Sequence, residues 1–269
     1  MAKELKTVEV LSDMTRHDEA NHDGEHDDGH DDGHVSGHDD GHDDDHGVTI
    51  IHGTNQADEI VTKGGPQHVI FGNGGDAVST GGGPDIIETG NGKDTLDAGG
   101  GPDKAMGGNG KDIVEGGCGP DILVGGNGKD VLIGGKGPDM LTGGHGADLF
   151  VYTAMSDAPA HGGDHGEDHG GDHEDEGGDS DGGTCSGPPR ETITDFEIGS
   201  DKIDLRMLPN VSAFSDEPVA YSVWVEQAGD DAMVMIDLNG SVEGGHAAEM
   251  AILLEQIDAS ALSADDFIL

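Results

Sequence analysis

An apolar residue recurs at every ninth position through the middle of the chain. The series is Ile60, Val69, Val78, Ile87, Leu96, Ala105, Val114, Leu123, Leu132, Leu141 and Phe150. Each nine-residue unit has a turn of six residues, with the pattern GGxGxD, and then three residues around the apolar one, as in GGNGKDIVE at 107–115. A short fixed period of this kind is typical of repeat architectures, in which stacked units bury a shared core. We therefore expect short strands, each with one inward side chain.

The turns alternate between two types, so the true period is 18 residues. One type has Asn at its third position, in Asn73, Asn91, Asn109 and Asn127. The other has Pro before its sixth position, in Pro66, Pro84, Pro102, Pro120 and Pro138. This alternation predicts a right-handed parallel β-roll with two units in each coil. One edge of the roll would carry the Asn turns and the other the Pro turns, and we call them the Asn edge and the Pro edge.

Four segments follow from the change of pattern along the chain. Residues 1–47 form an arm of Asp, His and Gly, which we expect to be disordered because Gly and Asp disfavour helix. Residues 53–151 are the repeat array. Residues 154–189 form a second acidic, His-bearing insert or loop. Residues 190–269 contain short strand patterns such as ETITDF and DAMVMIDL, which predict a small β-sandwich-like cap and make the chain all-β.

The strongly acidic charge of the chain limits what the repeat can bind. The chain carries 57 acidic and 12 basic residues, a formal charge of −45, which disfavours nucleic acid and anionic membrane surfaces as partners. No stretch approaches the ~18 apolar residues of a membrane span, and the first residues lack the apolar core of a cleaved signal peptide. Stacked carboxylates near 5 Å repel by about 3 kcal/mol at an effective dielectric of 20. A cation between them reverses the sign of this interaction.

The turn supplies the ligands that a hard cation prefers. Glycines allow a tight turn that aims carbonyl oxygens inward, and the sixth residue adds a carboxylate. Oxygen ligands of both kinds suit Ca²⁺, so several calcium ions and calcium-dependent folding are expected. Gln67 replaces the aspartate in one unit, and the unit at Gly53 lacks the second glycine. Sites there should be weak or absent.

These repeats resemble the RTX, or haemolysin-type, calcium-binding family. The segments ADLFVY (147–152), ETITDFEIGSDKIDL (191–205) and LSADDFIL (262–269) look like the C-terminal region of serralysin-type exoproteins. The resemblance implies export through type I secretion machinery by an uncleaved C-terminal signal, and an extracellular location. It also implies calcium ligation by the sixth-position aspartates. These are Asp76, Asp85, Asp94, Asp103, Asp112, Asp121, Asp130, Asp139 and Asp148, with Asp58 a weaker candidate.

Two histidine tracts are not explained by the roll. Their members are His22, His26, His30, His34, His38, His42, His46, His161, His165, His169 and His173. Neutral imidazole suits Zn²⁺ and related metals, so an extracellular zinc scavenger is the alternative to a structural, matrix or adhesion protein. A solvated tail without selected affinity explains the tracts equally well. No zinc-protease helix or nucleophile elbow is present, so we predict no enzyme. Cys118 and Cys185 could pair, but nothing in the sequence requires it.

Overall fold

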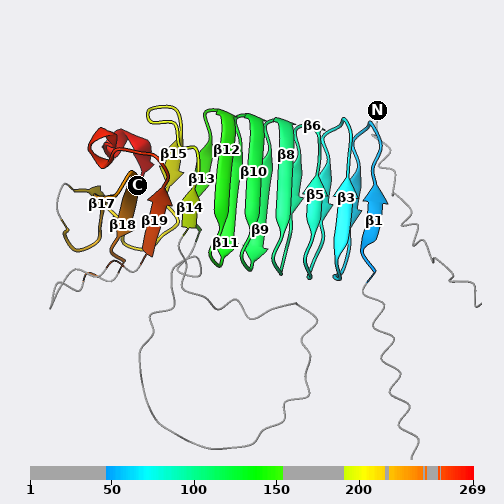
Figure 1. Ribbon diagram of the computed structural model, residues 1–269, viewed down its shortest axis with the longest axis horizontal. Helices are drawn as coiled ribbons and strands as arrows, with labels where there is room; N and C mark the ends of the chain where they lie inside the picture. Colours follow the sequence, from blue (N-terminus) through cyan, green and yellow to red (C-terminus); the bar gives the residue numbers. More distant parts are fainter. Residues whose placement is uncertain (1–46, 154–190, 216–217, 239, 241–247, 249) are drawn as a thin grey trace, which may run out of the picture.

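The computed structural model describes residues 47–153, 191–215, 218–238, 240, 248 and 250–269. The predicted arm, apart from Gly47, and the predicted insert lie outside these residues. In the described part nearly all regular structure is β, as Figure 1 shows. The only helical elements there are two 3₁₀ turns, η1 (Ala259–Ala261) and η2 (Ala264–Asp266). The all-β prediction is confirmed.

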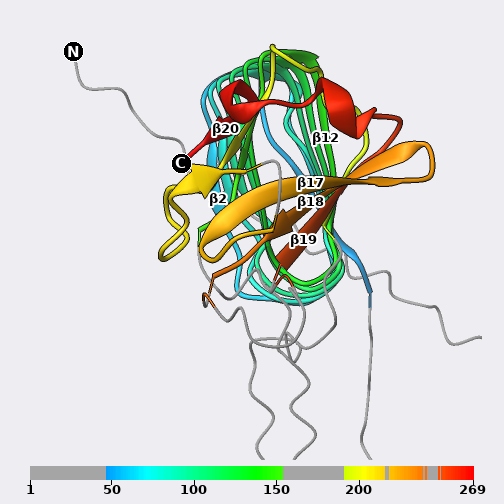
Figure 2. The same cartoon turned by 90° about the vertical axis from the view of Figure 1, so that its left-hand side faces the viewer.

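Successive strands of the roll belong alternately to two sheets. One sheet contains β1 (Thr49–His52), β3 (Gln67–Ile70), β5 (Ile86–Glu88), β6 (Asn91–Gly92), β8 (Lys104–Gly110), β10 (Ile122–Gly128) and β12 (Met140–Gly146). The other contains β2 (Glu59–Val61), β4 (Ala77–Ser79), β7 (Thr95–Asp97), β9 (Ile113–Cys118), β11 (Val131–Lys136) and β13 (Leu149–Val151). Figure 2 looks along the roll, where the coils stack behind one another.

The register confirms a coil of 18 residues. In the first sheet Ile122 pairs in parallel with Lys104 on one side and Met140 on the other. In the second sheet Leu132 pairs with Val114 and Phe150. The Asn residues of the turns form a ladder with the same spacing, for example from Asn109 Nδ2 to Asn91 Oδ1 at 2.7 Å. Two units therefore make one coil, as the alternating turns predict.

The core between the two sheets is one side chain thick from each strand. Every apolar residue of the nine-residue series is buried, from Ile60 to Phe150, and most have no exposed surface. Their immediate neighbours in sequence point outward, since Ile122 is 44% exposed beside the fully buried Leu123. So thin a core buries little apolar area for each coil, and the turns have to contribute to the stability of the roll.

The strands become longer halfway along the roll. β8 to β12 have six or seven residues, whereas β2 to β5 and β7 have three or four. We expected strands of three residues throughout. In the later coils pairing continues into the glycines of the next turn, as between Gly126 and Gly144. The change coincides with the first unit that begins with two glycines, at Gly107.

The C-terminal cap continues both sheets of the roll. β14 (Glu191–Ile193), β19 (Met250–Leu254), β18 (Asp231–Ile236), β17 (Ser222–Ala228) and β16 (Ala213–Phe214) extend the first sheet beyond β12. β15 (Lys202–Asp204) and β20 (Phe267–Ile268) extend the second beyond β13. The apolar segment 246–254, ambiguous from its sequence, contains the strand β19. The cap thus seals the last coil, as the left-hand side of Figure 1 shows.

Candidate metal sites

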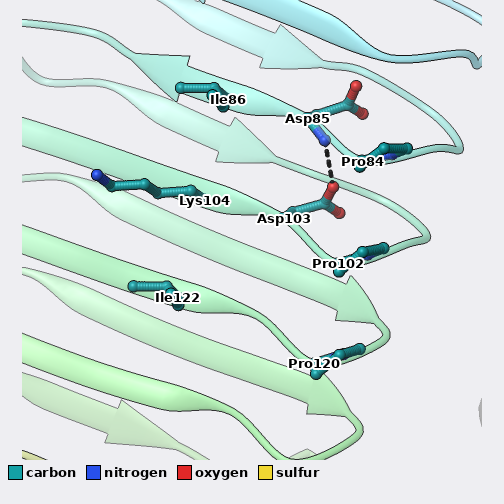
Figure 3. A pocket seen from close by; sticks show the side chains of 8 residues that line it. All are labelled: Pro84, Asp85, Ile86, Pro102, Asp103, Lys104, Pro120 and Ile122. Atoms are coloured by element: carbon teal, nitrogen blue, oxygen red, sulfur yellow. Dashed lines mark hydrogen bonds between the residues drawn. The ribbon is translucent and has the colours of Figure 1, made fainter. Parts of the chain in front are cut away.

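The sixth-position aspartates form one hydrogen-bonded ladder on each edge of the roll. The backbone N–H of each donates to Oδ1 of the aspartate 18 residues later, at 2.7 to 2.9 Å. The Asn edge runs through Asp58, Asp76, Asp94, Asp112, Asp130 and Asp148. The Pro edge runs through Gln67, Asp85, Asp103, Asp121 and Asp139. Figure 3 shows one such bond, from Asp85 to Asp103, beside the stacked prolines Pro84, Pro102 and Pro120.

The second oxygen of these carboxylates is buried without a hydrogen bond. This holds for Oδ2 of Asp76, Asp85, Asp94, Asp103, Asp112, Asp121, Asp130 and Asp148, whose residues are at most 3% exposed. A buried polar atom without a partner costs about 1–3 kcal/mol, and more if it is charged. Native proteins leave few such atoms. A regular row of them on both edges indicates that a ligand completes the site.

Burial shifts the protonation of the ladder strongly. Desolvation raises the pKa of Asp121 to about 8, of Asp103 to about 7 and of Asp112 to about 6, from an ordinary value of 3.8. The neighbouring aspartates of the same edge raise these pKa values further by repulsion, and the backbone N–H bonds lower them. Without a cation, burial of these ionised carboxylates costs free energy. A cation bound beside them would offset that cost.

In the units that start at Gly107, Gly116 and Gly125, the first glycine lies beside both a carboxylate oxygen and a backbone carbonyl oxygen. A Cβ atom built on Gly107 would stand 2.8 Å from Asp112 Oδ2 and 2.9 Å from the carbonyl oxygen of Gly125. A Cβ on Gly125 would meet Asp130 Oδ2 at 2.9 Å and the carbonyl oxygen of Gly143 at 2.7 Å. On the Pro edge, Gly116 has the same relation to Asp121 Oδ2 and the Gly134 carbonyl.

The space at these glycines is therefore lined by one carboxylate oxygen and one carbonyl oxygen from the next coil. These are hard oxygen ligands of the two kinds that Ca²⁺ takes in proteins. The residues present fit a calcium ion, and the sixth-position aspartates and first-position carbonyls would hold it. Bound there, the ion would neutralise the repulsion along each ladder.

The ladders continue into the cap through two acidic residues that the repeat pattern did not identify. Asp201 Oδ1 accepts the N–H of Asp148 at 2.9 Å, so Asp201 takes the next place on the Asn edge. Glu191 takes it on the Pro edge, since Thr192 N–H donates to the carbonyl of Asp139. A Cβ on Gly134 would stand 2.5 Å from Asp139 Oδ2 and 2.9 Å from Glu191 Oε2.

A signal for these two residues is present in the sequence. Glu191-Thr192-Ile193 and Asp201-Lys202-Ile203 repeat the order of acidic, variable and apolar residues that ends each turn. The repeat pattern does not reveal them, because neither six-residue turn opens with two glycines (SGPPRE at 186–191 and FEIGSD at 196–201) and the insert interrupts the period. The register of β14 on β12 and of β15 on β13 restores the correspondence.

In the first coil, side chains of the turn form hydrogen bonds within the same turn. Asp58 accepts hydrogen bonds from both the backbone N–H and the hydroxyl of Thr54. Gln67 donates through its side-chain amide to the carbonyls of Gly64 and Gly65, and its Oε1 accepts from the Thr62 hydroxyl. In these two turns the side chain at the sixth position is hydrogen-bonded within its own turn, and weak or absent sites at Asp58 and Gln67 stay a prediction.

The histidine tracts lie outside the described residues; their members are His22, His26, His30, His34, His38, His42, His46, His161, His165, His169 and His173. Within the part of the chain that is described, no group of three or more His, Cys, Asp or Glu side chains is arranged to hold a metal. The ladder sites differ from such groups because carbonyl oxygens supply part of the ligands. Zinc binding by the tracts stays a prediction.

Two further sequence features can be placed. Cys118 is disulfide-bonded, and Cys185, the other cysteine of the chain, lies outside the described residues. Among the residues that the structure describes, no helix is long and apolar enough to cross a membrane.

Comparison with solved structures finds similar chains. The AlgE6R3 subunit of the mannuronan C5-epimerase from Azotobacter vinelandii is 23% identical, with 69% of this chain and 80% of that chain covered and a TM-score of 0.36. The AlgE6R2 subunit of the same enzyme is 20% identical over 81% and 91% of the two chains, with a TM-score of 0.36. The extracellular lipase LipA from Serratia marcescens is 16% identical over 83% and 40%, with a TM-score of 0.27.

The repeat array itself has a clear family match. A comparison with curated proteins found no match, but the RTX calcium-binding nonapeptide repeat (4 copies) matches residues 71–105, 106–141 and 124–153. This range contains the aspartate ladders from Asp76 to Asp148 and every first-position glycine from Gly107 to Gly143. The resemblance seen in the sequence is confirmed, and the β-roll of this chain is a member of the RTX calcium-binding nonapeptide repeat family.

Proposed function

We propose that this protein is a secreted calcium-binding protein that folds on binding Ca²⁺ outside the cell and has a structural, matrix or adhesion role without enzymatic activity. The observation that carries the proposal is the set of buried Oδ2 atoms without hydrogen-bond partners that border a carbonyl oxygen of the next coil, those of Asp112, Asp121 and Asp130. Calcium converts these atoms from a cost to a source of stability. At calcium a hundredfold above Kd, each independent site adds about 2.7 kcal/mol to the free energy of unfolding.

The position of the C-terminal segment supports export before folding. Asp266 is 1% exposed and Phe267 6% exposed, and Phe267 pairs with Ile203 of β15. Asp266 Oδ1 also accepts the N–H of Gly199 at 3.0 Å. In the folded cap Asp266 and Phe267 are covered, so secretion machinery could reach these two side chains only in a chain whose cap has not folded. Low calcium inside the cell would keep the roll, and the cap that is built on it, open for export.

Circular dichroism during a calcium titration tests the folding claim. The full-length chain in chelator should show a coil-like far-UV spectrum and convert to a β spectrum with millimolar Ca²⁺, the affinity range of extracellular modules. Magnesium at the same ionic strength is the control, because its octahedral geometry and firmly held water fit such a turn poorly. A spectrum unchanged up to about 10 mM Ca²⁺ would contradict the proposal.

Export is tested separately in a bacterial host that carries a type I secretion system. The full chain should appear in the medium, and a chain that lacks residues 262–269 should remain in the cells. Equal secretion of both chains would remove the C-terminal segment from the account while leaving calcium binding untouched.

A further inference from the structure

The first residue of each nine-residue unit divides the roll into two halves. In the later units it is glycine, at Gly107, Gly116, Gly125, Gly134 and Gly143. In the earlier units, after Gly53, it is a residue with a side chain, at Thr62, Phe71, Thr80, Thr89 and Ala98. The division coincides with the change from short strands, cyan in Figure 1, to long strands, green in the same view.

Glycine is not needed at the first position for its backbone conformation. None of the five later glycines has a φ in the left-handed region, whereas the second glycines of the same turns do, for example Gly108 at 100° and Gly126 at 111°. The earlier units show directly that the same place in the turn accepts Thr, Phe and Ala. What the first-position glycine provides is the absence of a Cβ atom. On Gly107 a Cβ would lie 2.8 Å from Asp112 Oδ2 and 2.9 Å from the Gly125 carbonyl oxygen, so a side chain there would displace these two oxygens.

Threonine hydroxyls occupy the equivalent space in the earlier coils. The Thr89 hydroxyl donates to the carbonyl of Gly107 at 2.8 Å, and the Thr80 hydroxyl donates to the carbonyl of Ala98 at 2.8 Å. These carbonyls belong to the first residue of the next coil, as the Gly125 carbonyl does beside Gly107. Burial raises the pKa of Asp85 and of Asp94, and the hydroxyl in the same turn, Thr80 for Asp85 and Thr89 for Asp94, lies close enough to oppose part of that rise.

The two remaining residues fill the space with apolar atoms. Ala98 is fully buried with its Cβ at this position, and Phe71 is 7% exposed and packs in the core cluster. Neither offers an oxygen ligand. In the first half of the roll the place between carboxylate and carbonyl is thus taken by the protein itself, by a hydroxyl on Thr62, Thr80 and Thr89 and by carbon on Phe71 and Ala98.

We infer that the residue at the first position decides which turns hold a cation, so that calcium binds in the turns that start at Gly107, Gly116, Gly125, Gly134 and Gly143 and not in the turns that start at Thr62, Phe71, Thr80, Thr89 and Ala98. The inference rests on the proposed calcium-dependent function and deepens it. It assigns Asp112, Asp121, Asp130, Asp139 and Asp148 to ion-binding turns, with Glu191 a ligand in the Gly134 turn. It assigns Asp76, Asp85, Asp94 and Asp103 to the hydrogen-bonded ladder alone.

Counting bound ions in first-position variants tests the inference. Full-length protein would be equilibrated by dialysis in millimolar Ca²⁺ and its calcium measured by mass spectrometry. The double variant Thr80→Gly/Thr89→Gly should bind one more ion than the wild type for each opened turn. The double variant Gly116→Thr/Gly125→Thr should bind one fewer for each closed turn. Thr95→Gly is the matched control, because Thr95 is exposed in the same coil and lies outside the turn; its ion count should equal that of the wild type.

A smaller substitution at a single first-position glycine tests the inference if the double threonine variant does not fold. Gly125→Ala places in one turn the residue that Ala98 already places in another, and it should remove one ion while the β spectrum in calcium is retained. If the wild type binds calcium and none of these substitutions changes the count, the inference is overturned and the proposed function stands. If the wild type binds no calcium, the proposed function itself fails.

Discussion

The backbone N–H of Asp112 donates a hydrogen bond of 2.8 Å to Oδ1 of Asp130, the aspartate directly above it in the next coil. Oδ2 of Asp130 is buried and accepts no hydrogen bond. One oxygen of each carboxylate therefore holds the coils together, and the other faces the turn. The same residue serves both the stacking of the roll and its binding site, so stability and cation binding are coupled at every such turn.

Asp121→Asn should change stability in opposite directions with and without calcium. Without calcium the variant removes a buried carboxylate whose pKa burial raises to about 8, and its amide could donate to the Gly134 carbonyl, as the Gln67 amide donates to Gly64 and Gly65. In chelator, with an osmolyte such as sucrose added so that the calcium-free chain folds, the Tm of the variant should be higher than that of the wild type. With calcium a hundredfold above Kd, the variant should lose about 2.7 kcal/mol of calcium-dependent stability. Calorimetric melts in both conditions measure the two effects.

The control for this substitution is Asp230→Asn, which changes the same charge at an exposed position of the cap. It should leave both melts within about 0.5 kcal/mol of the wild type. A fall in the Tm of Asp121→Asn in chelator would show that Asp121 has a structural partner other than a cation.

Acid should stabilise the calcium-free protein. Burial raises the pKa of Asp103 to about 7 and that of Asp121 to about 8, above the ordinary value of 3.8. The folded state thus holds protons that the unfolded chain releases. The stability from these groups is complete below about pH 4 and is lost as the pH rises through 7 and 8. In chelator, with the same osmolyte to fold the calcium-free chain, the Tm should fall from pH 5 to pH 8.

With saturating calcium the fall in Tm with pH should be smaller or reversed, because at Asp121 the ion competes with protons for the carboxylate and gains affinity as it ionises. Asp121→Asn should have a shallower slope in chelator than the wild type. A Tm in chelator that increases with pH would contradict the burial of these carboxylates.

The single inward side chain of each strand should be sensitive to truncation. Leu123 is fully buried between Ala105 and Leu141 of the neighbouring coils, so Leu123→Ala should cost about 2–5 kcal/mol in calcium. The adjacent Ile122 is 44% exposed, and Ile122→Ala should cost under about 1 kcal/mol, as for a surface position. Denaturant unfolding in saturating calcium measures both, and equal costs would refute the register of the roll.

The C-terminal residues should stabilise the cap as well as serve export. The ring of Phe267 stacks on that of Phe214 with centroids 5.2 Å apart, and Phe267 is buried against β15. Phe267→Ala should lower the stability of the calcium-bound protein by about 3 kcal/mol, as for other buried aromatic residues. Leu269→Ala is the control, because Leu269 is 38% exposed. Thermal unfolding with equal losses for both would argue against this packing.

The roll could be predicted from the sequence because each of its rules is local and repeated. The apolar residue every ninth position, the alternating Asn and Pro turns and the series of aspartates give the core, the coil and the ladders directly. Glu191 and Asp201 could not be predicted because their coil follows the insert and neither of its turns opens with two glycines, so only tertiary pairing with Asp139 and Asp148 reveals their place.

The difference between the two halves of the roll also escaped sequence reasoning. Thr80, Thr89 and Ala98 look like tolerated changes of a glycine when the repeat is treated as a pattern of turn residues. Their effect depends on where the Cβ atom points, which is toward the free carboxylate oxygen and the carbonyl of the next coil. That direction belongs to the folded coil and not to the period.

Crystals grown in millimolar calcium, with data collected at a wavelength that reveals the anomalous signal of calcium, test the central claim most directly. The account predicts anomalous peaks on both edges of the roll, each between a sixth-position Oδ2 and a first-position carbonyl, as between Asp112 and Gly125. A folded roll without calcium peaks in these turns, or with its peaks only in other parts of the chain, would contradict it.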